Sequence, residues 1–254
     1  MTEADATTDA LLRDWSRWCN ALSDRAIVKP MKAVSLFATG AHAPPLNCVF
    51  TARSDVEPKP VEELLNMVKG LGLPHCLQIR PGCGPELATL ARSRGMHLES
   101  PVPLMRRESS GPDLATIAAH PSLVIRELTE DESQLHVSIA SSGFEAPPAL
   151  FEAVVTPAIL ALPGFHCYVG SVDRQPVTTA VGIVEEDHVG IYNVATLQAH
   201  RGRGYAAAIT ARAVLDGYAA TASFAFLQSS DSGFRVYERL GFRTLENWAV
   251  WVAA

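Results

Sequence analysis

Residues 198–206 read QAHRGRGYA and place two glycines and two arginines between an apolar run and an alanine-rich one. Gly202 and Gly204 have no side chain, so the main chain there can approach a ligand closely. The N–H groups at the start of a following helix, together with the helix dipole, form a site for an anion. Arg201 and Arg203 add positive charge, and a diphosphate is therefore the ligand that this loop predicts. The alternative is a glycine turn that only joins a strand to a helix.

A strand must lead into this loop and a helix must follow it. The segment HVGIYNVATL, residues 188–197, is apolar enough for a strand in the middle of a sheet. The segment YAAAITARAVLDGYA, residues 205–219, has apolar side chains at helical spacing. Thr129 and Glu132 fit a capping box at the start of an earlier helix. Upstream of the loop the pattern predicts strands at 123–128, 165–172 and 178–187 and helices at 129–143 and 148–161.

Two further patterns lie in this half of the chain. The glycine loop fits the pattern R-x-x-G-x-G/A. After the helix that follows the loop, we predict a strand at 222–230, a short helix at 232–242 and a strand at 246–252. The short helix fits the pattern Y-x-x-x-G-F. The matching residues are Arg201, Gly204 and Ala206 in the first pattern and Tyr237, Gly241 and Phe242 in the second. With both motifs at this separation, residues 122–254 resemble the GCN5-related N-acetyltransferases, the GNAT family. The resemblance implies an α/β fold with the mixed sheet of acyl-CoA N-acyltransferases.

The resemblance also implies a donor and a reaction. In the GNAT family the loop amides hold the diphosphate of CoA, and a β-bulge separates the preceding strand from its neighbour. We therefore expect acetyl-CoA as the acyl donor and a primary amine of a small molecule or peptide as the acceptor. A main-chain N–H aimed at the thioester oxygen would stabilise the oxyanion. The implied CoA-binding residues are Asn193, Val194, Ala195, Thr196, Arg201, Gly202, Arg203, Gly204, Tyr205, Ala206, Ser229 and Ser230.

Acyl transfer to an amine needs a deprotonated amine, a polarised carbonyl and reprotonation of the CoA thiolate. By resemblance Tyr237 lies near the CoA sulfur and is the general acid; the alternative is a tyrosine that packs on the sheet. The general base stays open among Glu145, His166, His188, the acidic run 185–187 and water. Glu145 follows a predicted helix, where the family lines its acceptor site, and could bind the amine without acting as a base.

Charge is divided unevenly along the chain. Residues 1–120 carry 13 Lys+Arg and 13 Asp+Glu, whereas residues 121–254 carry 8 and 14, so the whole net charge of −6 lies in the second half. An acidic domain is a poor nucleic-acid binder, because affinity for phosphates comes from clustered basic residues. The excess of acid predicts steering of a cationic acceptor towards the site, with plain solubility as the alternative.

Composition bounds the class of protein. The chain of 254 residues is 48% hydrophobic, yet no apolar run approaches the length of a membrane helix and no secretory leader pattern opens it. These features predict a soluble cytoplasmic protein without a membrane partner; a homodimer stays open. Five cysteines without C-x-x-C spacing indicate buried thiols rather than a disulfide framework or a metal site.

The first half predicts a smaller α/β domain. A helix around residues 11–22 precedes strands at 33–38, 47–52 and 75–80, helices at 59–72 and 84–96, and an extended segment at 97–108. The order of elements resembles that of the second half, so a degenerate GNAT-like duplication is a hypothesis. We place the boundary between residues 108 and 122, with domains at 1–112 and 122–254. A rival function of another class is a non-catalytic acyl-CoA-binding regulatory module.

Overall fold

The computed structural model describes residues 2–22 and 25–253, which form two compact units. The first unit comprises residues 1–104 and 244–254, and the second comprises residues 105–243. These units differ from the predicted domains, 1–112 and 122–254, in two places. The chain leaves the first unit within β6 (Val102–Glu108), and the last strand, β12 (Arg243–Ala253), returns to it. β12 belongs there because it forms an antiparallel ladder with β4 (His75–Ile79).

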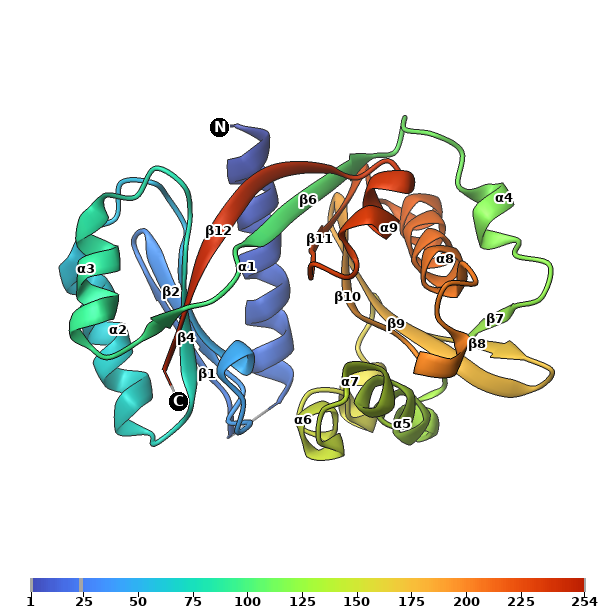
Figure 1. Ribbon diagram of the computed structural model, residues 1–254, viewed down its shortest axis with the longest axis horizontal. Coiled ribbons are helices and arrows are strands. Elements are labelled where there is room, and N and C mark those ends of the chain that lie inside the picture. The colour runs from blue at the N-terminus through green and yellow to red at the C-terminus, as the bar shows by residue number, and fades with distance from the viewer. Residues whose placement is uncertain (1, 23–24, 254) are drawn as a thin grey trace. The chain divides into compact units, whose positions relative to one another are not determined.

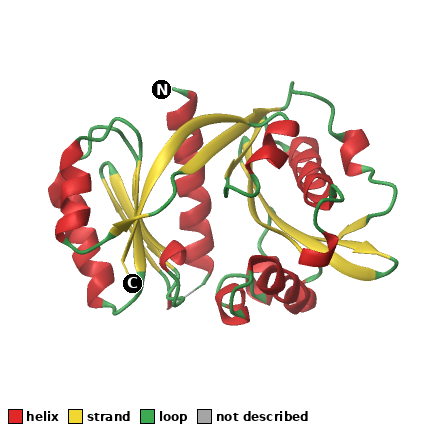
Figure 2. Ribbon diagram, in the orientation of Figure 1, coloured by secondary structure: helices red, strands yellow, loops and turns green. Residues whose placement is uncertain are grey.

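The first unit is a sheet with helices on both faces (Figures 1 and 2). Its strands lie in the order β1-β2-β3-β4-β12, and the β3–β4 pair is parallel. Leu36, Val49 and Leu77 face α2 and α3, whereas Phe37 and Phe50 contact Trp15 of α1 on the other face. The bounds are α1 Glu3–Ala21, β1 Ile27–Met31, β2 Val34–Ala38, η2 Pro44–Leu46, β3 Asn47–Thr51, α2 Pro58–Gly70, α3 Pro85–Ser93 and β5 His97–Leu98.

The second unit is built on a sheet with the order β11-β10-β9-β8-β7, antiparallel except for the β10–β11 pair. Helix α8 packs on one face and α5 on the other (Figure 2). Gly217 permits this close packing, because a Cβ there would lie 2.6 Å from the Val189 Cβ. The bounds are α4 Ala115–Ala118, β7 Val124–Glu127, η3 Glu130–Glu132, α5 Ser133–Phe144, α6 Pro148–Glu152, α7 Pro157–Leu160, β8 Phe165–Val172, β9 Gln175–Glu185, β10 His188–Thr196, η4 Gln198–His200, α8 Tyr205–Ala220, β11 Phe224–Gln228 and α9 Phe234–Arg239.

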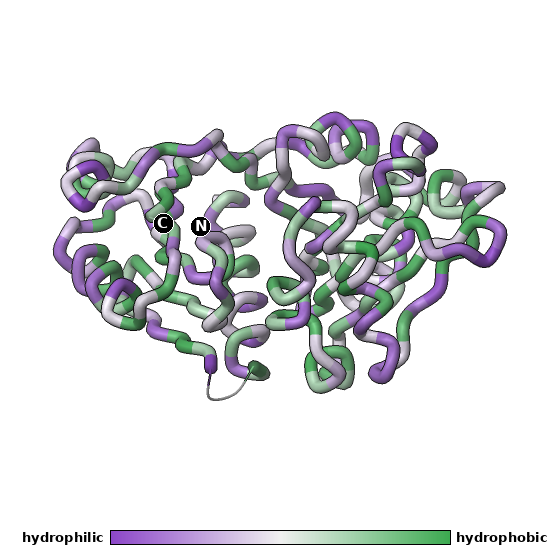
Figure 3. Tube along the Cα trace, turned by 60° about the horizontal axis from the view of Figure 1, so that its bottom comes forward, coloured by the Kyte–Doolittle hydropathy of each residue, from purple (hydrophilic) through white to green (hydrophobic). Residues whose placement is uncertain are grey.

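The mixed α/β sheet predicted from the sequence is confirmed. The capping box is also present, since the Thr129 amide donates to a Glu132 carboxylate oxygen at 3.0 Å. Figure 3 shows hydrophobic and hydrophilic residues interspersed along the chain of both units, as amphipathic elements require. Within the part of the chain that the structure describes, no helix has the length and apolar character to cross a membrane.

Candidate functional site

A β-bulge interrupts β10 shortly before its end. The strand pairs with β9 as far as Tyr192, and the register shifts before pairing resumes at Ala195. Asn193 adopts the left-handed conformation within this interval, with φ of 49°. The ladder to the parallel neighbour β11 ends earlier, at Gly190. The main chain of Asn193 and Val194 therefore lies outside both ladders, and β10 diverges from β11 as the resemblance implied.

The residues after the bulge are held in place by β9 and α5. Thr178 Oγ1 donates to the Ala195 carbonyl at 2.8 Å and lies 2.9 Å from Thr196 Oγ1. Gly143 of α5 packs so closely that a Cβ there would lie 2.9 Å from the Ala195 Cβ. The Ala195 carbonyl thus has a partner already, and of the four predicted pantetheine contacts Asn193 and Val194 have the more open main chain.

The glycine loop ends as the N-cap of α8. Gly202 and Gly204 have φ of 75° and 84°, a conformation that glycine adopts without strain. Gly204 provides no side-chain cap, and the first hydrogen bond of the helix runs from the Ala208 amide to its carbonyl at 3.0 Å. No described residue accepts a hydrogen bond from the amides of residues 205–207. This helix start therefore presents donors in the arrangement that suits an anion.

The two loop arginines contact carbonyl oxygens nearby. Arg201 donates from Nε to Thr196 at 3.3 Å and from Nη2 to Gly143, which ties the loop to β10 and α5. Arg203 reaches the Ala199 carbonyl at 3.5 Å. In this arrangement the Arg201 guanidinium positions the loop, and the loop amides carry the anion-binding geometry.

His120 also holds this loop, a role that its place in the sequence does not indicate. Its Nε2 donates to the Arg203 carbonyl at 3.0 Å, and its Nδ1 accepts from the Ser122 amide at 3.2 Å. The ring also packs edge-on against the buried Tyr205 at 5.1 Å between centroids. His120 precedes β7 and is 83 residues from its hydrogen-bond partner, so no local signal could have indicated this role.

Tyr237 lies on α9 with 9% of its surface exposed. Burial raises the pKa of Tyr237 to about 12, so the hydroxyl keeps its proton at neutral pH. Gly233 makes room for the ring, because a Cβ there would lie 2.8 Å from Tyr237 Cε2. Ser229 and Ser230 form the turn before α9: Ser229 donates to the Ser230 carbonyl at 2.8 Å, and Ser230 Oγ accepts from the Gly233 amide at 3.3 Å.

The candidate bases lie in different places. Glu145 is exposed directly after α5, in a left-handed conformation with φ of 55°. His166 pairs with Glu127 at 2.7 Å on β8. His188 is buried beside Phe224 and Phe226 at the start of β10. In the run 185–187, Glu185 ends β9 and the next two residues form the turn before His188, at the far end of β10 from the bulge. Glu145 is exposed and lies two residues after Gly143, whose carbonyl binds Arg201 of the loop.

A buried histidine beneath the bulge was also missed. His136 of α5 is fully buried, and its Nδ1 lies 2.8 Å from Thr179 Oγ1. Thr179 donates its own proton to the Tyr168 carbonyl, so it accepts from His136. The Nε2 atom is buried with no hydrogen-bond partner among the described residues, and burial lowers the pKa of His136 to about 4. Thr179 pairs in register with Ala195, which places His136 close behind the bulge.

Comparison with known proteins agrees with this geometry. Residues 163–244 match the family model described as "Acetyltransferase (GNAT) domain". A GCN5-related N-acetyltransferase from Kribbella flavida has a TM-score of 0.69 at 19% identity, over 95% of this chain and 94% of its own. A GCN5-related N-acetyltransferase-like protein from Streptococcus suis 89/1591 has a TM-score of 0.62 at 13% identity, over 98% of this chain and 99% of its own.

A third structure, a GCN5-related N-acetyltransferase from Sphaerobacter thermophilus, gives a TM-score of 0.64 at 15% identity, over 87% of this chain and 76% of its own. No curated protein matches this chain. At these identities the solved structures show the fold, and they show it over nearly the whole chain. The matched segment contains the bulged strand, the glycine loop and Tyr237. Residues 163–244 thus match a GNAT acetyltransferase domain, as the sequence motifs predicted.

Proposed function

We propose that this protein transfers the acetyl group of acetyl-CoA to a primary amine of a small molecule or peptide. One observation carries the proposal: within the family match, a bulged strand leads through the glycine loop into a helix whose first amides have no acceptor among the described residues. The strand supplies polar main-chain groups for an extended chain, and the helix supplies donors for a diphosphate. Both features suit a CoA thioester.

The residues present fit the two ends of such a donor. The amides of residues 205–207 would bind the diphosphate, with Gly204 allowing close approach. The main chain of Asn193 and Val194 would bind the pantetheine and polarise the thioester carbonyl. The amine nitrogen forms a bond to the carbonyl carbon, the carbon–sulfur bond breaks, and the amine loses a proton to water. Tyr237 delivers its proton to the departing sulfur and regains one from solvent.

A cationic amine, such as a polyamine, an aminoglycoside or a basic peptide, is the acceptor that best suits the acidic second half of the chain. Residues 121–254 carry 14 acidic against 8 basic residues. Glu145 is exposed two residues after Gly143, whose carbonyl binds Arg201 of the loop. Its carboxylate would pair with the charge of the acceptor and draw the amine towards the bulge. Glu145 therefore binds and orients the acceptor in this proposal.

The test measures thiol release from acetyl-CoA by the full chain with a panel of amines, and mass spectrometry identifies the acetylated product. We expect turnover with cationic amines. Calorimetry of acetyl-CoA alone separates the rival function: binding without turnover on any amine would support a non-catalytic acyl-CoA-binding module. Absence of both binding and turnover would contradict both functions.

Salt dependence tests the role of Glu145. Raising salt from about 0.1 M to about 1 M shortens the Debye length from about 10 Å to about 3 Å, so kcat/KM for a cationic acceptor should fall. The decrease should be smaller in Glu145→Gln. Glu186→Gln removes the same charge from the turn at the far end of β10 and should retain the wild-type salt dependence. A salt dependence that is the same in all three proteins would remove Glu145 from the acceptor site.

A further inference from the structure

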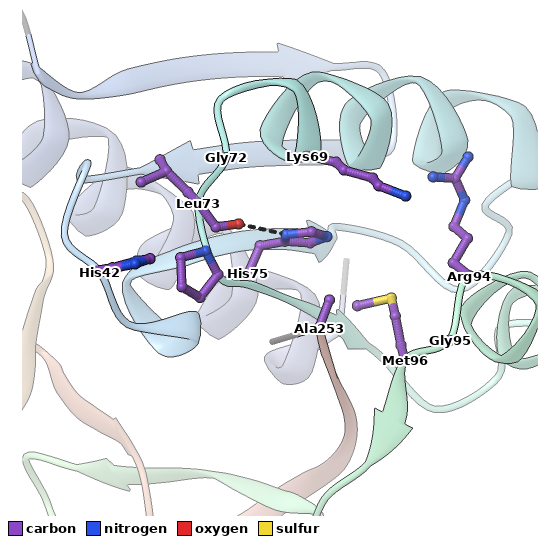
Figure 4. A pocket seen from close by; sticks show the side chains of 10 residues that line it. His42, Lys69, Gly72, Leu73, His75, Arg94, Gly95, Met96 and Ala253 are labelled. Carbon is purple, nitrogen blue, oxygen red and sulfur yellow. Dashed lines mark hydrogen bonds between the residues drawn. The ribbon is translucent and has the colours of Figure 1, made fainter.

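The first unit contains a pocket of about 530 Å³, which is large enough for a small organic molecule. Figure 4 shows the side chains around it. Two of the lining residues, Lys69 and Arg94, are cationic, two are histidines, and none is acidic. The lining residues are His42, Lys69, Gly72, Leu73, Pro74, His75, Arg94, Gly95, Met96 and Ala253.

Two helix ends bring the basic side chains together. After α2, Gly72 turns the chain with φ of 69° and leads into β4 at His75. After α3, Gly95 turns the chain with φ of 74° into Met96. Lys69 and Arg94 therefore come from corresponding ends of the two helices. Figure 4 shows the Lys69 side chain extending towards Arg94 above the ring of His75.

His75 is 7% exposed, and among the described residues only one of its ring nitrogens has a hydrogen-bond partner. Its Nδ1 lies 2.9 Å from the Leu73 carbonyl, which can only accept, so Nδ1 carries the proton. Nε2 of the neutral ring is then an acceptor, and no described residue donates to it. In Figure 4 this atom points into the space between the side chains of Lys69 and Met96. A ring nitrogen without a donor, in a side chain that is otherwise largely buried, suits a hydroxyl donor on a ligand.

The two cationic side chains, Arg94 and Lys69, also have hydrogen-bond donors that no described residue accepts from. Arg94 binds Glu62 through Nη2 at 3.0 Å, but its Nε is buried without a hydrogen-bond partner among the described residues. Lys69 is exposed and forms no ion pair with a described residue. Cations at helix C-terminal ends also offset the helix dipole. That role alone does not require the unpaired Nε of Arg94 or the unused acceptor nitrogen of His75.

We infer that this pocket binds a small hydroxylated organic anion, a carboxylate or a phosphate monoester. Its anionic group would lie between Lys69 and Arg94, and a neighbouring hydroxyl would donate to Nε2 of His75. The site consists of first-unit residues only and does not depend on the function proposed for the second unit.

The test is calorimetry of the full chain, at constant ionic strength in sodium chloride, with two matched pairs of probes: lactate with propionate, and glycerol 3-phosphate with n-propyl phosphate. We expect at least one hydroxylated probe to bind and its partner without the hydroxyl to bind about tenfold more weakly. The pair that binds more tightly identifies the anion as a carboxylate or a phosphate. Removing Nε2 by His75→Phe should abolish the preference for the hydroxylated probe.

Two lysine variants of the same helix provide the matched control. Lys69→Gln should weaken binding about tenfold or more, because a charged hydrogen-bond donor is lost. Lys59→Gln removes the same charge near the start of α2, about 15 Å away by the helical rise, and should leave binding unchanged. Failure of all four probes to bind would overturn the inference, as would equal weakening by the two variants. Equal affinity within both pairs would overturn the role of His75.

Discussion

Nε2 of His120 lies 3.0 Å from the main-chain oxygen of Arg203, one residue before the N-cap glycine of α8. The Ser122 amide donates to the other ring nitrogen, so the two bonds together fix a neutral tautomer with its proton on Nε2. His120 thereby fixes the main chain that enters the helix, without itself presenting a group to a diphosphate.

Replacing His120 should therefore weaken acetyl-CoA binding. His120→Ala removes the donor, and we expect the dissociation constant measured by calorimetry to rise about tenfold. His120→Gln keeps an N–H donor and should recover most of the affinity. His97→Gln, at an exposed site in the first unit, serves as the control. Wild-type affinity in His120→Ala would show that the loop holds its conformation without this bond.

The N-cap glycine gives a second prediction. Gly204 has φ of 84°, and a residue with a Cβ pays about 1–2 kcal/mol in that conformation. A Cβ there would contact only the His120 ring, at 3.6 Å, so Gly204→Ala should fold with a modest loss of stability. In the proposed function the diphosphate must approach the main chain closely here, so acetyl-CoA binding should fall sharply in Gly204→Ala, and Gly204→Val should abolish it.

Gly95→Ala separates backbone strain from loss of the site. Gly95 has φ of 74°, and a Cβ there would meet nothing within 4 Å. Thermal unfolding should therefore show a similar loss of stability for Gly95→Ala and Gly204→Ala, whereas calorimetry should show weakened acetyl-CoA binding in Gly204→Ala alone. Equal affinity of these two variants for acetyl-CoA would contradict the assignment of the diphosphate to this loop.

The sequence predicted this loop in detail because its signals are local. Glycines before an alanine-rich run indicate a left-handed turn into a helix, and Gly204 occupies that position. His120 could not be found in the same way, because its role depends on a contact across 83 residues. Strand β12 illustrates the same limit: its pattern predicts a strand, but its pairing with β4 assigns it to the first unit. Strand β1 was missed because Lys29 and Pro30 interrupt an edge that is only half-buried.

Tyr237→Phe provides the test of the proton donor. The variant keeps the ring, so acetyl-CoA affinity should be unchanged while kcat falls about 10²-fold. Because burial raises the pKa of Tyr237 to about 12, the wild-type enzyme should lose no activity through deprotonation of this group until the pH approaches that value. Gly233→Ala would push against the ring at 2.8 Å and should lower kcat with the hydroxyl retained. Wild-type kcat in Tyr237→Phe would assign proton delivery to water.

The boundary of the second unit can be tested with two fragments. Met105 and Leu114 belong to its buried core, and the buried Arg107 donates to the Leu240 carbonyl at 2.8 Å. A fragment of residues 105–243 contains all three, whereas a fragment of residues 122–254 lacks them. Removing each buried apolar side chain lowers the free energy of unfolding by about 2–5 kcal/mol. Only the fragment of residues 105–243 should therefore unfold cooperatively on heating. Equal stability of the two fragments would favour a boundary after residue 112.

The acid sensitivity of folding should depend on His136. Its pKa is lowered from 6.5 to about 4 because the neutral ring is buried and the charged ring would be desolvated. Above the higher value neither the folded nor the unfolded state binds a proton here. Between pH 6.5 and about pH 4 mainly the unfolded state binds a proton at His136, so the free energy of unfolding falls as the pH falls. Below about 4 both states are protonated and the loss levels off.

Urea denaturation should show this loss. Between about pH 7 and about pH 5, His136 should account for a decrease of about 2 kcal/mol in the free energy of unfolding. Carboxylates with lowered pKa, such as Asp5 and Glu132, contribute mainly below that interval, because their ordinary values are 3.8 and 4.5. His136→Asn keeps a donor to Thr179 but cannot titrate, so its decrease should be smaller by that amount. An equal decrease in His136→Asn would mean that the His136 ring takes up its proton in the folded protein.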